Sequence, residues 1–286
     1  MLKFLTLCIS GVMLGCIYGL IALGYGLIYK ASGLMSFVQG DMLTLGAFLG
    51  LTYWLSLLLT MLCAFAFGML LEKGVIRRLL NKKVMPIYVV LATIAISYIL
   101  QNGSQLIWGT WTLNFPSVFK ASTVKLFGLL AVQPEVILCL ILSMVSMVVL
   151  HLFMNKTKLG TAMRASSMDS MAAESCGINV SLTTGITWGV SAMLAAMAGI
   201  LIGPMYGVYS SLGANLGNKG FAGAIAGGYG NMYGAIVGGI LLGLLEILVS
   251  GYVSSAYKNL IAYVALLLFL CIKPTGLFNE RAIQDV

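Results

Sequence analysis

The chain alternates long apolar runs with short polar segments. Five runs predict membrane-spanning helices, at residues 5–29, 86–108, 134–154, 182–207 and 257–272. Most of them reach the roughly 18–20 residues that cross a hydrocarbon core as a helix. The runs are continuous, whereas the strands of a membrane barrel would alternate apolar and polar positions. The pattern therefore predicts an all-α polytopic membrane protein.

Two further apolar blocks are interrupted. Residues 42–71 are too long for one upright helix and short for two, and Ser56 is the expected turn between two short helices. The string GGYGNMYG (227–234) divides residues 219–252 into a short Gly/Ala-rich piece and a full span. The chain then has nine hydrophobic segments. This predicts about eight or nine transmembrane segments, some short or re-entrant, in a single transmembrane domain over 1–286.

Composition and charge agree with a lipid environment. Hydrophobic residues make up 60% of the chain and charged residues 8%, and the mean hydropathy is +1.02, whereas soluble domains carry roughly a quarter charged residues. The net charge of +8 requires no nucleic acid partner, because the bases stand between the spans. With the N-terminus outside and alternating spans, eleven of the 16 Lys and Arg residues lie on the cytoplasmic side. Lys219 and the loops 109–133, 208–218 and 253–257 are then expected outside.

The sequence carries no motif for covalent catalysis, a metal or a bound nucleotide. His151 is the single histidine, none of the six cysteines forms a CxxC pair, and no GxxxxGK[ST] loop is present. We therefore expect no catalytic residue, no metal site and no cofactor. The protein is predicted not to be an enzyme, and any ATP hydrolysis that drives it belongs to another chain.

Polar residues at membrane depth are the remaining candidates, because each is costly there unless it has a partner or water. Ser36, Gln39 and Asp41 lie in SGLMSFVQGD between two apolar runs. They either line a translocation pathway or form a turn that caps the next helix. Asn102, near the end of its span, is another pathway candidate, although interfacial capping also explains it. Glu246 is expected to make a hydrogen bond inside the bundle.

Residues 155–181 predict a cytoplasmic loop containing a short amphipathic helix, then a turn and the next span. The residues expected to share one face of this helix are Leu159, Ala162, Met163, Met168, Ala172 and Cys176. Gly177 suits the position after the helix, and Asn179 or Ser181 can cap the following span. The face is built of small residues and methionine without Trp or Phe. This favours docking into a protein groove over lying on lipid.

From these residues alone, the permease of an ATP-driven importer and a stand-alone carrier or channel are equally good explanations. A membrane-embedded enzyme is a weaker one. Four longer stretches distinguish them by resemblance: GLIYKASGLMSFVQGDMLTLGAF (26–48), KLGTAMRASSMDSMAAESCGIN (158–179), GFAGAIAGGYGNMYGAIVGGILLGLLE (220–246) and IKPTGLF (272–278). In this order and over nearly the whole length, the chain resembles the membrane permease of branched-chain amino acid ABC importers, the LivH type.

The resemblance implies an ABC importer permease architecture in the bacterial inner membrane. It implies as partners two ABC ATPase subunits, a second homologous permease subunit or another copy of this chain, and an extracytoplasmic substrate-binding protein. The residues that match the family's ATPase-coupling loop are Gly160, Arg164, Ala165, Asp169, Ala172, Gly177 and Ile178. Residues 32–41 correspond to the family's polar element, with Gln39 where a histidine is common. The implied substrate is a branched-chain amino acid, although permeases for urea, short amides and other small solutes share the architecture.

Overall fold

The computed structural model of the 286-residue chain describes residues 2–50, 55–82, 84–114, 124–126, 130–255, 257–273 and 275–278. The elements before residue 110 are α1 (Leu2–Ser32), α2 (Val38–Leu49), α3 (Leu55–Leu71), the π-helical turn η1 (Glu72–Ile76), α4 (Arg77–Asn81) and α5 (Pro86–Trp108). An antiparallel hairpin of β1 (Val124–Leu126) and β2 (Leu130–Val132) follows. The later helices are α6 (Pro134–Lys156), α7 (Lys158–Met168), α8 (Ser170–Ser175), α9 (Val180–Tyr206), α10 (Leu212–Gly227), α11 (Met232–Tyr252) and α12 (Lys258–Ile272).

Within the described part of the chain, six helical runs are long and apolar enough to cross a membrane. They are α1, α5, α6, α9, α11 and the continuous run through α3, η1 and α4. The shorter apolar helices α2, α10 and α12 complete the nine hydrophobic segments expected from the sequence. The protein is therefore an all-α polytopic membrane protein, as predicted. Its small hairpin contacts α1 through β2.

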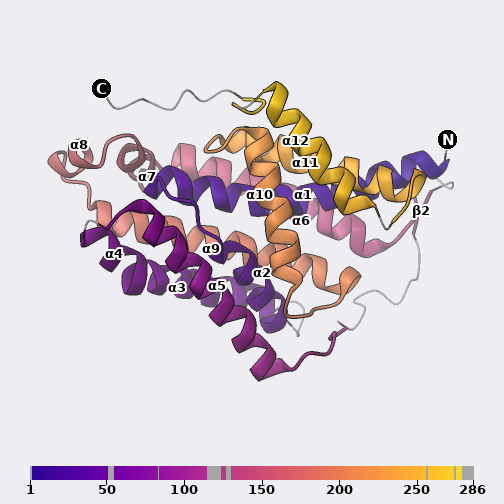
Figure 1. Cartoon of the computed structure of the whole chain (residues 1–286), viewed down its shortest axis with the longest axis horizontal. Coiled ribbons are helices and arrows are strands. Elements are labelled where there is room, and N and C mark those ends of the chain that lie inside the picture. The colour runs from indigo at the N-terminus through magenta and orange to yellow at the C-terminus, as the bar shows by residue number, and fades with distance from the viewer. Residues whose placement is uncertain are drawn as a thin grey trace.

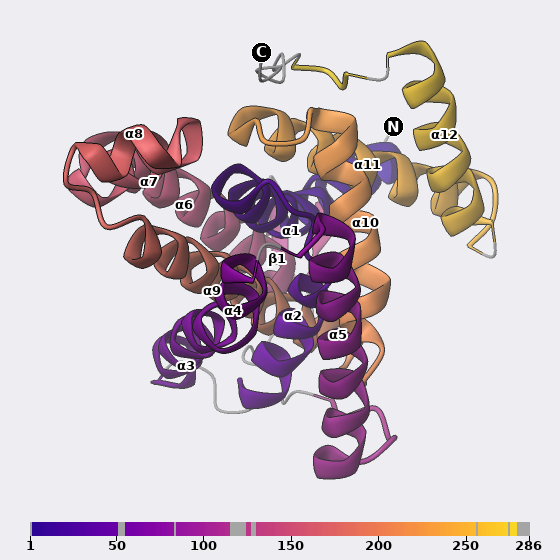
Figure 2. The ribbon, with the colours of Figure 1, turned by 60° about the vertical axis from the view of Figure 1, so that its left-hand side comes forward.

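The helices run between two distinct ends of the molecule. Figure 1 shows α4, α7 and α8 gathered at one end, named the α8 end here, and the N-terminus and the β-hairpin at the other, the hairpin end. In the middle, α1 is surrounded by α6, α9, α10 and α11 (Figure 2). Glycines let α1 and α11 approach closely, because a Cβ on Gly15 would lie 2.5 Å from the Ile240 Cα. This contact holds the centre of the bundle together.

The turn expected at Ser56 is wrong. Ser56 lies inside α3, which begins at Leu55, and α2 has already ended at Leu49. A lone serine is too weak a helix breaker to set the boundary. The second helix is also longer than expected. It continues through η1 to Asn81, because Glu72, the first charged residue after the apolar run, is paired with Arg77 of the same helical run.

The single amphipathic helix expected within 155–181 is also wrong. At Asp169 the backbone is extended (φ −150°, ψ 111°), and its carboxylate accepts a hydrogen bond of 3.0 Å from the Ala172 N–H. Asp169 thereby ends α7 and caps α8. The expected face is divided, because Met163 is buried in the bundle whereas Met168 is exposed.

The outer loop expected at 208–218 is shorter than predicted, since α10 begins at Leu212. The Gly213 N–H donates to Thr44 Oγ1 of α2 at 2.8 Å. A Cβ on Gly213 would lie 1.9 Å from the Gly40 carbonyl oxygen, so the two backbones are in direct contact. Packing against α2 therefore continues the helix through a polar, glycine-rich sequence.

Candidate translocation site

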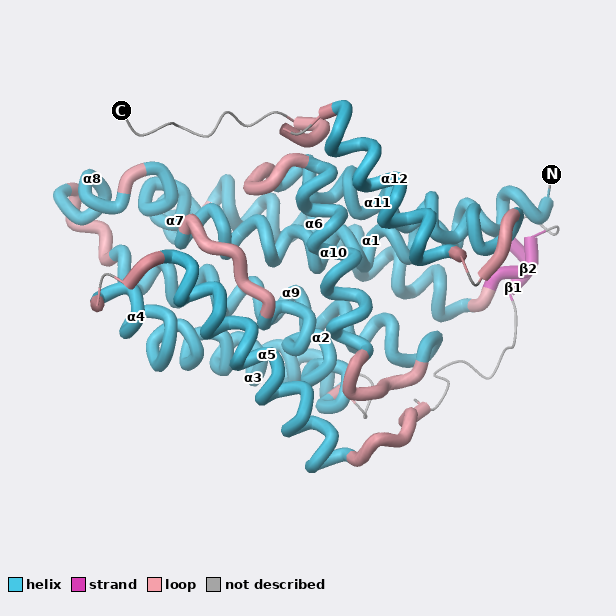
Figure 3. The backbone as a smooth tube through the Cα atoms, viewed as in Figure 1, coloured by secondary structure: helices cyan, strands magenta, loops and turns pink. Residues whose placement is uncertain are grey.

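The polar stretch after α1 enters the bundle as extended backbone. Residues 33–37 form a loop that leads from the end of α1 to the start of α2 (Figure 3). The Phe37 N–H donates to Thr93 Oγ1 of α5 at 3.3 Å, and Leu34 and Ser36 are buried. Irregular backbone at membrane depth is tolerated only where protein or water covers it. This stretch is therefore more than a surface turn before the next helix.

Asp41 reaches the middle of the bundle from the first turn of α2. Its carboxylate accepts a hydrogen bond from the hydroxyl of Ser97, which stands at the midpoint of α5, and its side chain lines a cavity of about 230 Å³. Asp41 is only 3% exposed, and its Oδ1 atom has no hydrogen-bond partner among the described residues. This cavity, named the Asp41 cavity, therefore combines space with an unsatisfied acid.

The walls of the Asp41 cavity come from four helices. Gln101 of α5 and Asn218 of α10 add amide groups, and Phe37 and Ile94 add apolar surface. Tyr25 of α1 closes another side. A partly open cavity that combines apolar surface with several polar groups is typical of small-molecule sites.

Gln39 lies outside this cavity, in the packed junction of α1, α2 and α9. Its Nε2 donates to the Ser191 carbonyl at 2.8 Å, and the Ser191 hydroxyl lies 2.8 Å from both Gln39 Oε1 and the Gly24 carbonyl oxygen. A Cβ on Gly24 would lie 2.0 Å from Gln39 Nε2. The contacts of Gln39 hold three helices together in the described structure.

The remaining two pathway candidates have different surroundings. Ser36 is buried, and its hydroxyl has no partner within the described part of the chain. Asn102 is exposed, and its side-chain N–H donates to the carbonyl of Tyr98, a residue of the cavity wall, at 2.7 Å. Of the four candidates, Asp41 therefore lines the cavity and Asn102 lies one helical turn from its wall.

A second buried acid, Glu246, belongs to an ion-pair cluster. Its Oε1 accepts from Lys219 Nζ at 2.6 Å, its Oε2 accepts from the Tyr18 hydroxyl at 2.7 Å, and Lys258 Nζ lies 3.8 Å away. The hydrogen bond expected for Glu246 inside the bundle is thus confirmed. The expectation that Lys219 lies in an outer loop is wrong, because it is buried within α10 beside its counter-ion.

A third buried acid lies near the α8 end. Glu72 of η1 pairs with Arg77 at 2.5 Å and accepts from the Thr184 hydroxyl at 3.3 Å. Arg77 also donates to the carbonyl of Ser181 in the first turn of α9. This cluster joins the α3–α4 run to the helix that follows α8.

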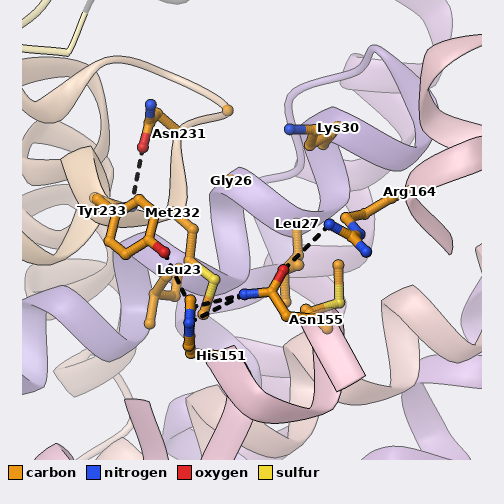
Figure 4. A pocket seen from close by; sticks show the side chains of 13 residues that line it. Leu23, Gly26, Leu27, Lys30, His151, Asn155, Arg164, Asn231, Met232 and Tyr233 are labelled. Atoms are coloured by element: carbon orange, nitrogen blue, oxygen red, sulfur yellow. Dashed lines mark hydrogen bonds between the residues drawn. The ribbon is translucent and has the colours of Figure 1, made fainter. Parts of the chain in front are cut away.

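Two of the proposed coupling residues face the bundle rather than solvent. A Cβ on Gly160 would lie 2.4 Å from the Phe153 carbonyl oxygen, so Gly160 lets α7 fold closely against α6. Arg164 Nη1 donates to Asn155 Oδ1 at 3.1 Å and lines a second cavity of about 190 Å³ with His151 and Tyr233 (Figure 4). Arg164 therefore ties α7 to α6.

The other end of the coupling segment projects outward. Met168 and Met171 are 74% and 80% exposed, and Ala172 is exposed beside them. Gly177 has the predicted left-handed conformation (φ +82°), and the Ile178 N–H donates to the Ala173 carbonyl in a Schellman turn. Ala165 and Ile178 are half-buried. The capping of α9 by Asn179 is confirmed, because its side chain accepts from the Leu182 N–H at 3.0 Å.

The chain matches one family of membrane transport proteins over most of its length. The family described as the permease component of the branched-chain amino acid transport system matches residues 7–270. The chain belongs to this family. It is accordingly a transport permease subunit and a multi-pass protein of the inner membrane.

Individual members of the permease family are similar to this chain in sequence over long alignments. The high-affinity branched-chain amino acid transport system permease protein LivH of Escherichia coli K12 is 30% identical over 309 residues, covering 100% of this chain and 98% of LivH. LivH of Salmonella typhimurium is 29% identical with the same coverage. BraD of Pseudomonas aeruginosa is 30% identical over 198 residues, covering 62% of this chain and 63% of BraD. No solved structure matches the chain.

Sequence reasoning did not single out two polar residues of this permease's cavity. Ser97 carried a usable signal, because it is a hydroxyl at the midpoint of a membrane span. Asn218 did not, because its sequence neighbourhood is polar and glycine-rich, which indicates a loop. Only the packing of α10 against α2 places Asn218 at the cavity.

Proposed function

We propose that this chain is the membrane-spanning subunit of an ATP-driven importer for branched-chain amino acids, which an extracytoplasmic binding protein delivers. The observation that carries this proposal is the match to the permease family over residues 7–270, together with similarity to LivH over the full length of both chains. The Asp41 cavity supports it, because its volume of about 230 Å³ is several times the roughly 30 Å³ of one water molecule and so leaves room for a small solute. The translocation pathway passes this cavity, with Asn102 beside it, Ser36 next to Phe37 of its wall, and Gln39 positioning α2.

The α8 end faces the cytoplasm in this proposal. In the alternating topology expected from the sequence, eleven of the 16 Lys and Arg residues fall on the side that contains residues 155–181, and removing the buried Lys219 leaves four on the opposite side. An excess of Lys and Arg marks the cytoplasmic side of a membrane protein. The hairpin end is then the face that receives the binding protein.

Two ABC ATPase subunits bind at the α8 end and supply the hydrolysis, since this subunit is itself not an enzyme. The coupling residues divide into two groups. Ala172, with its methionine neighbours, forms the docking surface, and Gly177 and Ile178 form the turn that connects this surface to α9. Gly160, Arg164, Ala165 and Asp169 hold α7 and α8 in the orientation that docking requires. A second homologous permease subunit, or another copy of this chain, completes the transporter.

The experiment that tests the function is uptake of labelled L-leucine by the complete transporter, with urea as the competing substrate. We expect ATP-dependent accumulation of leucine and none of urea. Uptake of urea without uptake of leucine would show that the substrates are urea and short amides and not branched-chain amino acids. Uptake by this chain without any ATPase subunit would favour a stand-alone carrier.

The docking proposal is tested by Ala172→Trp, because a bulky ring on a small-residue surface prevents close approach of the ATPase. We expect the ATPase subunits to be lost on co-purification and uptake to be lost with them. Val145→Trp is the matched control, since Val145 is an exposed apolar residue of α6, far from α8. Normal ATPase recovery with Ala172→Trp would instead support a helix that lies on lipid, where tryptophan is favourable.

A further inference from the structure

Three acids are buried among the described residues, and they differ in their partners. Glu246 has Lys219 and Lys258 within 4 Å, and Glu72 has Arg77. Asp41 makes no salt bridge with any described residue. The Ser97 hydroxyl satisfies one of its oxygens, and the other lacks a donor within the described structure.

A carboxylate at membrane depth without a counter-ion is costly, because no opposite charge stabilises it. Ionisable residues inside a membrane mark substrate or ion pathways, so the partner of Asp41 is to be sought in a ligand. The space beside Asp41 shows where that partner fits. The missing partner is a cation small enough for a cavity of about 230 Å³.

The other walls of the cavity indicate the chemistry of the rest of the ligand. The amides of Gln101 and Asn218 carry N–H donors suited to a carboxylate, and Phe37 and Ile94 offer apolar surface. A ligand with an ammonium group, a carboxylate and an apolar side chain complements all three kinds of wall. A free α-amino acid has this composition.

We propose that Oδ1 of Asp41 receives the α-ammonium group of the transported amino acid, while the Ser97 hydroxyl orients the Asp41 carboxylate by donating to its Oδ2. This inference rests on the proposed function and names the group that recognises the substrate inside the membrane. It makes the permease itself selective for solutes with a cationic nitrogen, in addition to any selection by a binding protein. Neutral amides and urea lack the charge that Asp41 requires.

The first test is Asp41→Asn in the complete transporter, reconstituted in liposomes with its ATPase subunits, second permease subunit and binding protein. The amide keeps the shape of the side chain and an oxygen that accepts from Ser97, but removes the charge. We expect L-leucine uptake to fall about tenfold or more, the range of one charge-assisted hydrogen bond, while the ATPase subunits still co-purify. The matched control is Glu135→Gln, the same chemical change at the start of α6 outside the cavity.

A second test does not depend on the folding of that variant. Ala214, a residue of the cavity wall, is changed to cysteine in a chain whose exposed Cys63, Cys176 and Cys271 are replaced by serine. Millimolar L-leucine should slow modification by a methanethiosulfonate reagent in the purified transporter. The keto acid of the same carbon skeleton, which lacks the ammonium group, should not. Equal protection by both compounds would overturn the assignment.

The two proposals fail in different ways. If the unaltered transporter takes up leucine and Asp41→Asn does so at the same rate, the ammonium site is wrong and the proposed function stands. If the unaltered transporter, with all its partners, does not take up leucine, the proposed function is wrong. Reduced uptake that is confined to Asp41→Asn, together with protection by leucine only, supports both.

Discussion

Two buried carboxylates near the middle of the bundle have opposite surroundings. Glu246 accepts hydrogen bonds from Lys219 and Tyr18 and has Lys258 nearby, whereas Asp41 accepts from Ser97 and has an oxygen without a partner among the described residues. Both are almost fully buried, at 2% and 3% exposure. The difference shows that burial alone does not define the role of a charge in a membrane. A fully compensated charge joins helices, and an uncompensated one beside a cavity is available to a ligand.

The packing around the two acids agrees with this division. Glu246 belongs to α11, whose glycines contact α1 directly, and a Cβ on Gly243 would lie 2.3 Å from the Gly15 nitrogen. Such an interface has no space for a solute and little freedom to move. Asp41 belongs to a helix of twelve residues that follows an extended loop and borders a cavity. Short elements that begin and end inside the bundle are where a pathway can open.

The largest effect is expected from Glu246→Gln, which leaves Lys219 buried without a counter-ion. We expect the free energy of unfolding to fall by about 3–5 kcal/mol, because breaking a buried pair leaves an uncompensated charge. The loss is measured by thermal melting of the purified protein, with size-exclusion chromatography after each heating step to quantify the protein that remains folded. The double variant Glu246→Gln with Lys219→Met should recover much of it. Wild-type melting of the single variant would contradict a structural role for this ion pair.

A smaller loss is expected from Glu72→Gln. Its partner Arg77 is 27% exposed, so water partly compensates the guanidinium once the carboxylate is gone. We expect the free energy of unfolding to fall by about 1.5–3 kcal/mol, the range for a hydrogen bond to a charged group. The same melting assay should place this variant between wild type and Glu246→Gln. A loss of stability as large as that of Glu246→Gln would show that the solvent exposure of the basic partner does not determine how much each ion pair contributes.

The smallest effect on stability is expected from Asp41→Asn, although the same change should abolish most leucine uptake. Removing a buried charge that has no counter-ion relieves a cost, so the melting temperature should stay unchanged or rise, by no more than about 1 kcal/mol in free energy. A marked decrease in melting temperature would mean that Asp41 has a structural partner after all. Asp41 would then be a structural acid like Glu246, and not one available to a ligand.

Much of the architecture could be predicted from the sequence, because it depends on local properties. Continuous apolar runs predict the spans, and the Gly-rich string 227–234 separates α10 from α11 as expected. The left-handed Gly177 and the capping residue Asn179 follow from the rules for helix ends. The turn at Ser56 was wrong because it was set by one weakly helix-breaking residue. The single helix in 155–181 was wrong because Asp169 caps a helix more effectively than the apolar pattern indicated.

The sequence by itself determined that this chain is a bundle of membrane helices, where most of those helices end, and that acids such as Asp41 and Glu246 stand within or beside apolar runs. Only the tertiary structure decided which of these residues are satisfied. Glu246 and Lys219 are 27 positions apart, and Asp41 and Ser97 are 56 apart. Helix formation depends on a residue and its near neighbours along the chain, whereas the compensation of a charge depends on which helices become neighbours in space. For that reason the acid that joins helices and the acid that borders a cavity look alike in the sequence and differ in the fold.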